Sequence, residues 1–137
     1  MLYLFFVHEL PVCCTSLTAL QKELPDFIRI KKIIGGLAPD TTQPMPVELQ
    51  QNIQQTWRRI EQTVPNMRFN YDFWVINIPV RSTYPACRAI LAARQQGADF
   101  EDKMIGAIQT AYYQKAKNPS LPSTLLQCAL EVGIGRR

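Results

Sequence analysis

Adjacent cysteines near the start of the chain are the residues with the most specific chemistry. The sequence holds four cysteines and one histidine: Cys13 and Cys14 follow His8 closely, while Cys87 and Cys128 stand far along the chain. Zinc sites are typically built from Cys-x-x-Cys or histidine pairs, so this spacing predicts no metal site. The adjacent pair is either a site of thiol chemistry or two incidental cysteines at the end of a strand.

The surroundings of the pair favour Cys14 as the nucleophile. A helix is predicted to begin at Thr15 or Ser16, and the start of a helix stabilises a nearby thiolate and lowers its pKa. Cys14 is nearer the helix start, whereas Cys13 is a poor resolving thiol because adjacent cysteines form only a strained ring. His8, as an imidazolium, would lower the thiol pKa further; the alternative is a partly exposed residue at a strand end.

Hydrophobic periodicity predicts how the chain positions this pair. Apolar runs at residues 2–7 and 27–34 are typical of strands, and a helix over 16–24 between them implies a parallel pair. The remainder is expected to be mostly helical, with a helix at 47–64, an aromatic segment with a short helical turn at 67–80, a helix capped by Ser82 or Thr83 and closed by Gly97, a helix capped by Asp99, and a last helix at 123–132.

Composition and charge exclude several classes of function. The chain has 137 residues and a net charge of +4, with lysines and arginines scattered rather than clustered, so no nucleic-acid surface is predicted. No apolar run is long enough to span a membrane, and the first apolar run lacks the features of a signal peptide. A cytoplasmic protein is therefore expected.

Several motifs resemble those of bacterial DsbA-family thiol-disulfide oxidoreductases, in particular the cytosolic branch of DsbA-like or protein-disulfide-isomerase-like proteins. The resemblance extends over about residues 27 to 132. It rests on Val7-His8, Ile34-Gly35-Gly36-Leu37-Ala38-Pro39-Asp40, Pro44-Met45-Pro46, Phe69-Asn70 with Phe73-Trp74, Arg81-Ser82-Thr83-Tyr84-Pro85-Ala86-Cys87-Arg88-Ala89, and Ala111-Tyr112-Tyr113 with Asn118-Pro119.

The resemblance implies an α/β chain with a partial thioredoxin-like fold, in which a β-α-β start carries a large all-helical insertion. Residues 1–44 would begin the thioredoxin-like domain, 45–118 would form the insertion, and 119–137 would return to it. Protein thiols and disulfides or small thiols would be the partners, with no cofactor but glutathione as a co-substrate. Trp74 and its aromatic neighbours would line a substrate groove or pack in the core.

The sequence departs from the family in two places. Cys13-Cys14 replaces the family's Cys-x-x-Cys, and the chain stops before the family's later strands, so it resembles a truncated member with impaired activity and an exposed sheet edge open to self-association. Two alternatives stay open. One is glutathione-dependent transferase or isomerase chemistry of the related kappa class, with Thr15 or Ser16 holding the glutathione thiolate. The other is a non-enzymatic protein that binds a partner.

Overall fold

The computed structural model describes residues 2–8, 20–38 and 40–135, and gives side-chain surroundings from residue 20 onward. Two strands, β1 (Leu2–His8) and β2 (Ile28–Ile34), pair in parallel from Leu2 opposite Ile28 to His8 opposite Ile34. The predicted parallel pair is confirmed. Residues 20–23 form a helical turn, and the earlier part of the helix predicted at 16–24 lies outside the described residues.

The alternation along β2 explains why its sequence pattern was only partly regular. Residues 28, 30, 32 and 34 are half-buried and the residues between them are exposed, so Lys32 shares the covered face with three isoleucines. Its ammonium group forms an ion pair with Asp102. The chain thus places a charged residue on the covered face of the sheet and satisfies it with a carboxylate from a helix distant in sequence.

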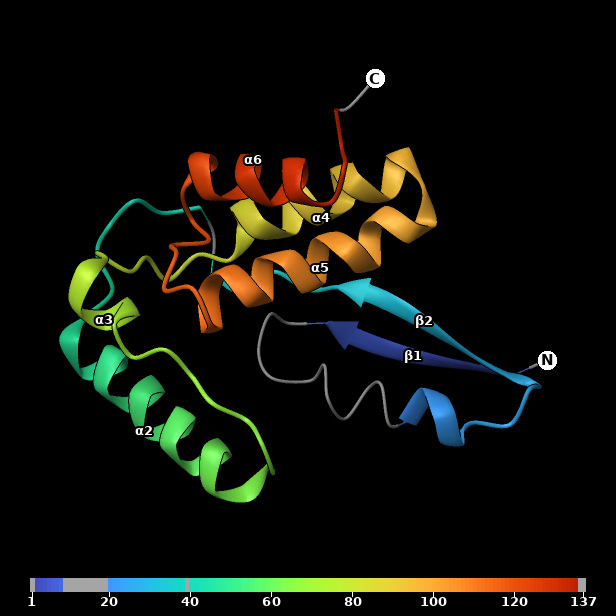
Figure 1. Ribbon diagram of the computed structural model, residues 1–137, viewed down its shortest axis with the longest axis horizontal. Coiled ribbons are helices and arrows are strands. Elements are labelled where there is room, and N and C mark those ends of the chain that lie inside the picture. The colour runs from blue at the N-terminus through green and yellow to red at the C-terminus, as the bar shows by residue number, and fades with distance from the viewer. Residues whose placement is uncertain (1, 9–19, 39, 136–137) are drawn as a thin grey trace.

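Helices make up most of the remaining described chain (Figure 1). Helices α4 (Tyr84–Gln96), α5 (Ala98–Tyr113) and α6 (Pro122–Glu131) pack on one another, and α5 lies next to the sheet (Figure 1). Helix α2 (Val47–Thr63) and the short α3 (Phe73–Ile76) form a separate group (Figure 1). The architecture is that of a partial thioredoxin-like fold with a large helical part, as predicted, while the predicted boundaries at 44/45 and 118/119 stay predictions.

Most helix ends lie close to their predicted positions. Gly97 ends α4, and Gly133 ends α6 with a positive φ of 91°, where the following Ile134 N–H donates to the Ala129 carbonyl at 2.9 Å. The predicted cap at Asp99 is wrong: α5 begins two residues earlier, with Gly97 as its N-cap, and Asp99 lies in the first turn. An acidic residue there still stabilises the helix through its dipole.

Two hydrophobic clusters hold the helices together. The larger lies between α4, α5 and α6 and contains Ile90, Met104, Ile108 and Cys128, with Ile108 fully buried. The smaller surrounds Trp57 of α2 and consists of Trp57, Phe69, Phe73, Tyr113 and Ala116, with partly buried neighbours. Because Trp57 is the only fully buried residue of α2, most of this helix surface remains in contact with solvent.

Candidate functional site

Most of the residues predicted to carry the thiol chemistry lie outside the described part of the chain. Cys13, Cys14, Thr15 and Ser16 lie outside the described residues, and of His8 only the backbone, at the end of β1, is described. The two strands run in parallel and end side by side (Figure 1), so His8 marks the carboxyl edge of the sheet. The roles of these five residues stay predictions.

The two remaining cysteines are packed residues, as the sequence indicated. Cys87 in the first turn of α4 is 7% exposed, and its thiol lies 3.7 Å from the Gly35 carbonyl oxygen. Burial raises the pKa of this thiol and outweighs the opposite effects of Thr83 and Arg88. Burial also raises the pKa of the Cys128 thiol. Both are therefore poor nucleophiles compared with an exposed thiolate.

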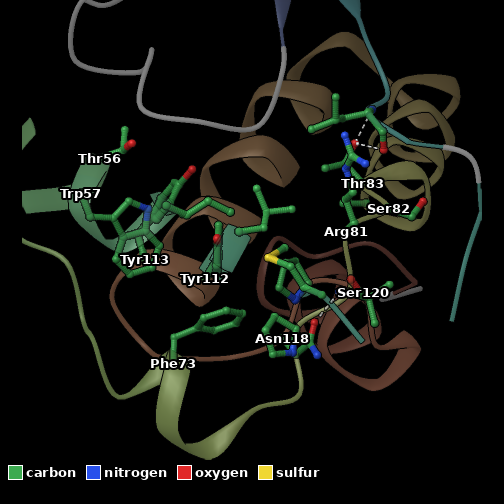
Figure 2. A pocket seen from close by; sticks show the side chains of 18 of the residues that line it. Thr56, Trp57, Phe73, Arg81, Ser82, Thr83, Tyr112, Tyr113, Asn118 and Ser120 are labelled. Atoms are coloured by element: carbon green, nitrogen blue, oxygen red, sulfur yellow. Dashed lines mark hydrogen bonds between the residues drawn. The ribbon is translucent and has the colours of Figure 1, made fainter. Parts of the chain in front are cut away.

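A pocket of about 370 Å³ lies where α2, the loop after β2, the start of α4 and the end of α5 meet (Figure 2). Within the described part of the chain, no group of three His, Cys, Asp or Glu residues is placed to hold a metal. Most of the pocket lining is apolar. Its lining comprises Leu37, Met45, Leu49, Ile53, Thr56, Trp57, Ile60, Phe73, Pro79, Val80, Arg81, Ser82, Thr83, Ala86, Tyr112, Tyr113, Asn118, Pro119 and Ser120.

One side of the pocket is aromatic (Figure 2). Trp57 stacks on Phe69 with ring centroids 4.7 Å apart and meets Tyr112 edge-on at 5.5 Å. Phe73 contacts Tyr112 at 4.7 Å. Desolvation raises the pKa of the Tyr112 phenol well above its ordinary value, so this ring is neutral throughout the physiological range. These contacts build a rigid apolar wall.

Trp74, one of the predicted substrate residues, packs within this aromatic cluster rather than on the pocket lining. Its ring lies 5.2 Å from Trp57 and 5.1 Å from Phe73. Its indole N–H is buried and has no hydrogen-bond partner among the described residues. Phe73, from the same aromatic segment, does line the pocket. The segment therefore contributes to both the core and the pocket, and a substrate role for Trp74 stays a prediction.

The opposite side of the pocket is polar and ties β2 to α4. Thr83 accepts a hydrogen bond from the Leu37 N–H at 2.7 Å through its hydroxyl, and its own N–H donates to the Leu37 carbonyl at 3.0 Å. Ser82 donates to the Ala38 carbonyl at 3.1 Å and accepts from the Tyr84 N–H at 3.3 Å. The expected side-chain cap by Thr83 is absent from α4, because the loop after β2 takes its hydroxyl instead.

The sequence predicts Ser82 and Thr83 only as helix caps, and this polar wall is not evident from it. The signal available was the Arg81-Ser82-Thr83-Tyr84-Pro85 run within the motifs that carry the family resemblance. Among the described residues of the lining, Arg81 is the single charged one, and none is Asp or Glu. The site therefore combines an apolar body with a weakly positive rim.

Three solved structures with the same fold carry descriptions that refer to disulfide chemistry. A Nitrosomonas europaea protein provisionally described as a protein disulfide isomerase matches with a TM-score of 0.78 and 20% identity, over 96% of this chain and 65% of its own. The cytosolic disulfide reductase DsbM from Pseudomonas aeruginosa matches with a TM-score of 0.75 and 23% identity, over 98% and 66%. Its complex with GSH matches with a TM-score of 0.73 and 22% identity, over 98% and 67%.

These matches confirm that the chain has a DsbA-like, thioredoxin-type fold. The chain spans about two-thirds of the length of these structures. A scan against protein-family models finds no match, and neither does a search of curated proteins. Among the described helices, none is both long and apolar enough to cross a membrane.

Proposed function

We propose that the chain is a thiol-disulfide oxidoreductase or isomerase that acts on small or protein thiols in the cytoplasm. The observation that carries this proposal is the fold shared over nearly the whole chain with solved structures described as disulfide isomerase and disulfide reductase. DsbM is described as cytosolic and is solved with GSH, which supports a reducing compartment and glutathione as co-substrate.

The sequence around Cys14 supports a one-thiol reaction. The Cys14 thiolate attacks one sulfur of a substrate disulfide; a mixed disulfide forms and the other substrate sulfur leaves as a thiolate. A glutathione thiolate then attacks the substrate sulfur of the mixed disulfide. This regenerates the Cys14 thiolate and leaves the substrate disulfide-bonded to glutathione. A second glutathione reduces that bond, releases the substrate thiol and forms oxidised glutathione, so two electrons pass from glutathione to the substrate.

This mechanism does not require Cys13 as a resolving thiol. Adjacent cysteines close only a strained disulfide ring, so an external thiol is the more effective resolving group. The four cysteines then divide into a reactive site and two buried residues, Cys87 and Cys128, which serve as internal references.

The test measures alkylation of each cysteine against pH by mass spectrometry on the folded chain. It also measures glutathione-driven reduction of a model peptide disulfide. We expect Cys14 to react at pH values well below its ordinary pKa of about 8.5, while Cys87 and Cys128 react only after unfolding. Cys14→Ser should abolish turnover, whereas Cys13→Ser should retain most of it. Cys128→Ala, which removes a buried thiol, is the matched control and should retain turnover.

Two results would overturn the proposal. If Cys13 and Cys14 both titrate as ordinary thiols and no disulfide is reduced, the chain is not an oxidoreductase. If a glutathione-dependent reaction persists after both are replaced by Ser, the chemistry belongs to a hydroxyl group such as Thr15 or Ser16. Circular dichroism of each variant separates loss of chemistry from loss of fold.

A further inference from the structure

We propose that the pocket between α2 and the start of α4 binds a small amphipathic anion, with an aromatic or aliphatic body against the aromatic wall and one carboxylate at Arg81. The inference rests on the described lining of the pocket alone, and its test does not depend on the thiol chemistry proposed for Cys13 and Cys14. Three properties of the pocket carry the inference: its volume, its apolar interior and the positive charge of the one charged residue in its described lining.

Volume and lining select the class of ligand. A volume of about 370 Å³ lies at the small end of the range of small-molecule sites, so the pocket suits a compact organic molecule rather than a folded partner. Its interior is formed mainly by apolar side chains, among them Leu49, Ile53, Trp57 and Phe73. Trp57 and Phe73 are only 3% and 2% exposed, so they are fixed by packing and present preformed surfaces.

Charge selects the sign of the polar group. Arg81 is exposed, is the single charged residue among the described residues of the lining, and has no salt bridge with any of the described residues. The neighbouring Arg88 differs, because its guanidinium is paired with Asp40 at 2.7 Å. An uncompensated guanidinium beside an apolar cavity favours a carboxylate and disfavours a cation.

The start of α4 strengthens this preference. Helix α4 has thirteen residues, no acidic residue in its first turn and no side-chain cap at Thr83. Ala86 lies in that first turn and lines the cavity. The partial positive charge of a helix N-terminus therefore adds to that of Arg81 on the same wall (Figure 2).

The test compares two probes of nearly identical shape, 1-naphthaleneacetate and the uncharged 1-naphthaleneacetamide, titrated into the full chain by isothermal titration calorimetry at neutral pH. We expect saturable one-to-one binding of the carboxylate, tighter than that of the amide by about tenfold or more, the size expected for a charge-assisted hydrogen bond. Trp57 fluorescence should change with the same midpoint, because this ring lines the pocket.

Three variants locate the binding. Arg81→Gln should reduce the affinity for the carboxylate to that for the amide, and Arg59→Gln, which changes an exposed arginine of α2 outside the pocket, should leave both affinities unchanged. Thr56→Trp, at an exposed lining position, should fill the cavity and abolish binding of both probes.

Four outcomes would overturn the proposal. They are no saturation by the carboxylate at concentrations on the order of 10 mM, equal affinity for the two probes, an unchanged preference in Arg81→Gln, and retained binding in a folded Thr56→Trp variant.

Discussion

Gln109 of α5 carries a buried amide that should make the protein less stable than it could be. The residue is 7% exposed, and its Nε2 group has no hydrogen-bond partner in the described part of the chain. An unsatisfied buried donor costs about 1–3 kcal/mol of folding free energy. Met has a similar length and no polar hydrogen, so Gln109→Met should remove this cost and keep the packing.

The expected gain in unfolding free energy can be expressed as a rise in melting temperature. We take about 1.5 kcal/mol as the gain, within the range for an unsatisfied donor. For a chain of 137 residues, the entropy of unfolding is about 290 cal/mol/K. The melting temperature should therefore rise by about 5 °C. Differential scanning calorimetry gives this value, and urea unfolding followed by circular dichroism gives the free energy independently.

Two companion variants make the experiment decisive. Gln55→Met changes an exposed glutamine of α2 and should alter the free energy of unfolding by less than about 0.5 kcal/mol. Gln109→Glu should lower the melting temperature at neutral pH, because it buries a charge with no described partner. A lower melting temperature for Gln109→Met would refute the reasoning and show that the amide is bonded in solution.

Three further predictions follow from the packing. A Cβ added to Gly36 would lie 2.5 Å from the Tyr84 ring. Gly36→Ala should therefore destabilise the chain by about 1–3 kcal/mol, and adding Tyr84→Ala should cancel most of this loss in urea unfolding. Ile108→Ala, at a fully buried position, should cost about 3–4 kcal/mol, whereas Leu91→Ala, which is 40% exposed, should cost less than about 1 kcal/mol; equal losses would contradict the assigned core. The folded state raises the pKa of Tyr112, so its contribution to stability is complete below the ordinary tyrosine pKa of about 10 and falls as the pH rises above it. Tyr112→Phe should therefore reduce the decline in unfolding free energy above pH 10, and an unchanged decline would contradict this cause.

Local patterns in the sequence were sufficient for most of the secondary structure. The apolar runs at 2–7 and 27–34 predicted a parallel pair, observed as Leu2–His8 and Ile28–Ile34. The helical periodicity at 47–64 predicted α2, and Gly97 and Gly133 predicted two helix ends. The missed cap at Asp99 shows the limit of such reasoning, because several neighbouring residues can begin a helix equally well.

The candidate site was only partly predictable. Ser82 and Thr83 were identified by their position before α4, but their hydrogen bonds reach Leu37 and Ala38, more than forty residues away. Whether a serine or threonine caps its own helix or binds a distant loop depends on which backbone groups the fold brings close. No local pattern contains that information.

The sequence by itself determined the order of strands and helices and the DsbA-like class of fold, because periodicity, caps and glycines act over a few residues. Only the tertiary structure decided that Lys32 pairs with Asp102, that Trp74 packs against Trp57, and that Arg81 lines a pocket. These features depend on contacts between segments far apart in the chain, and such contacts form only when the whole chain is packed.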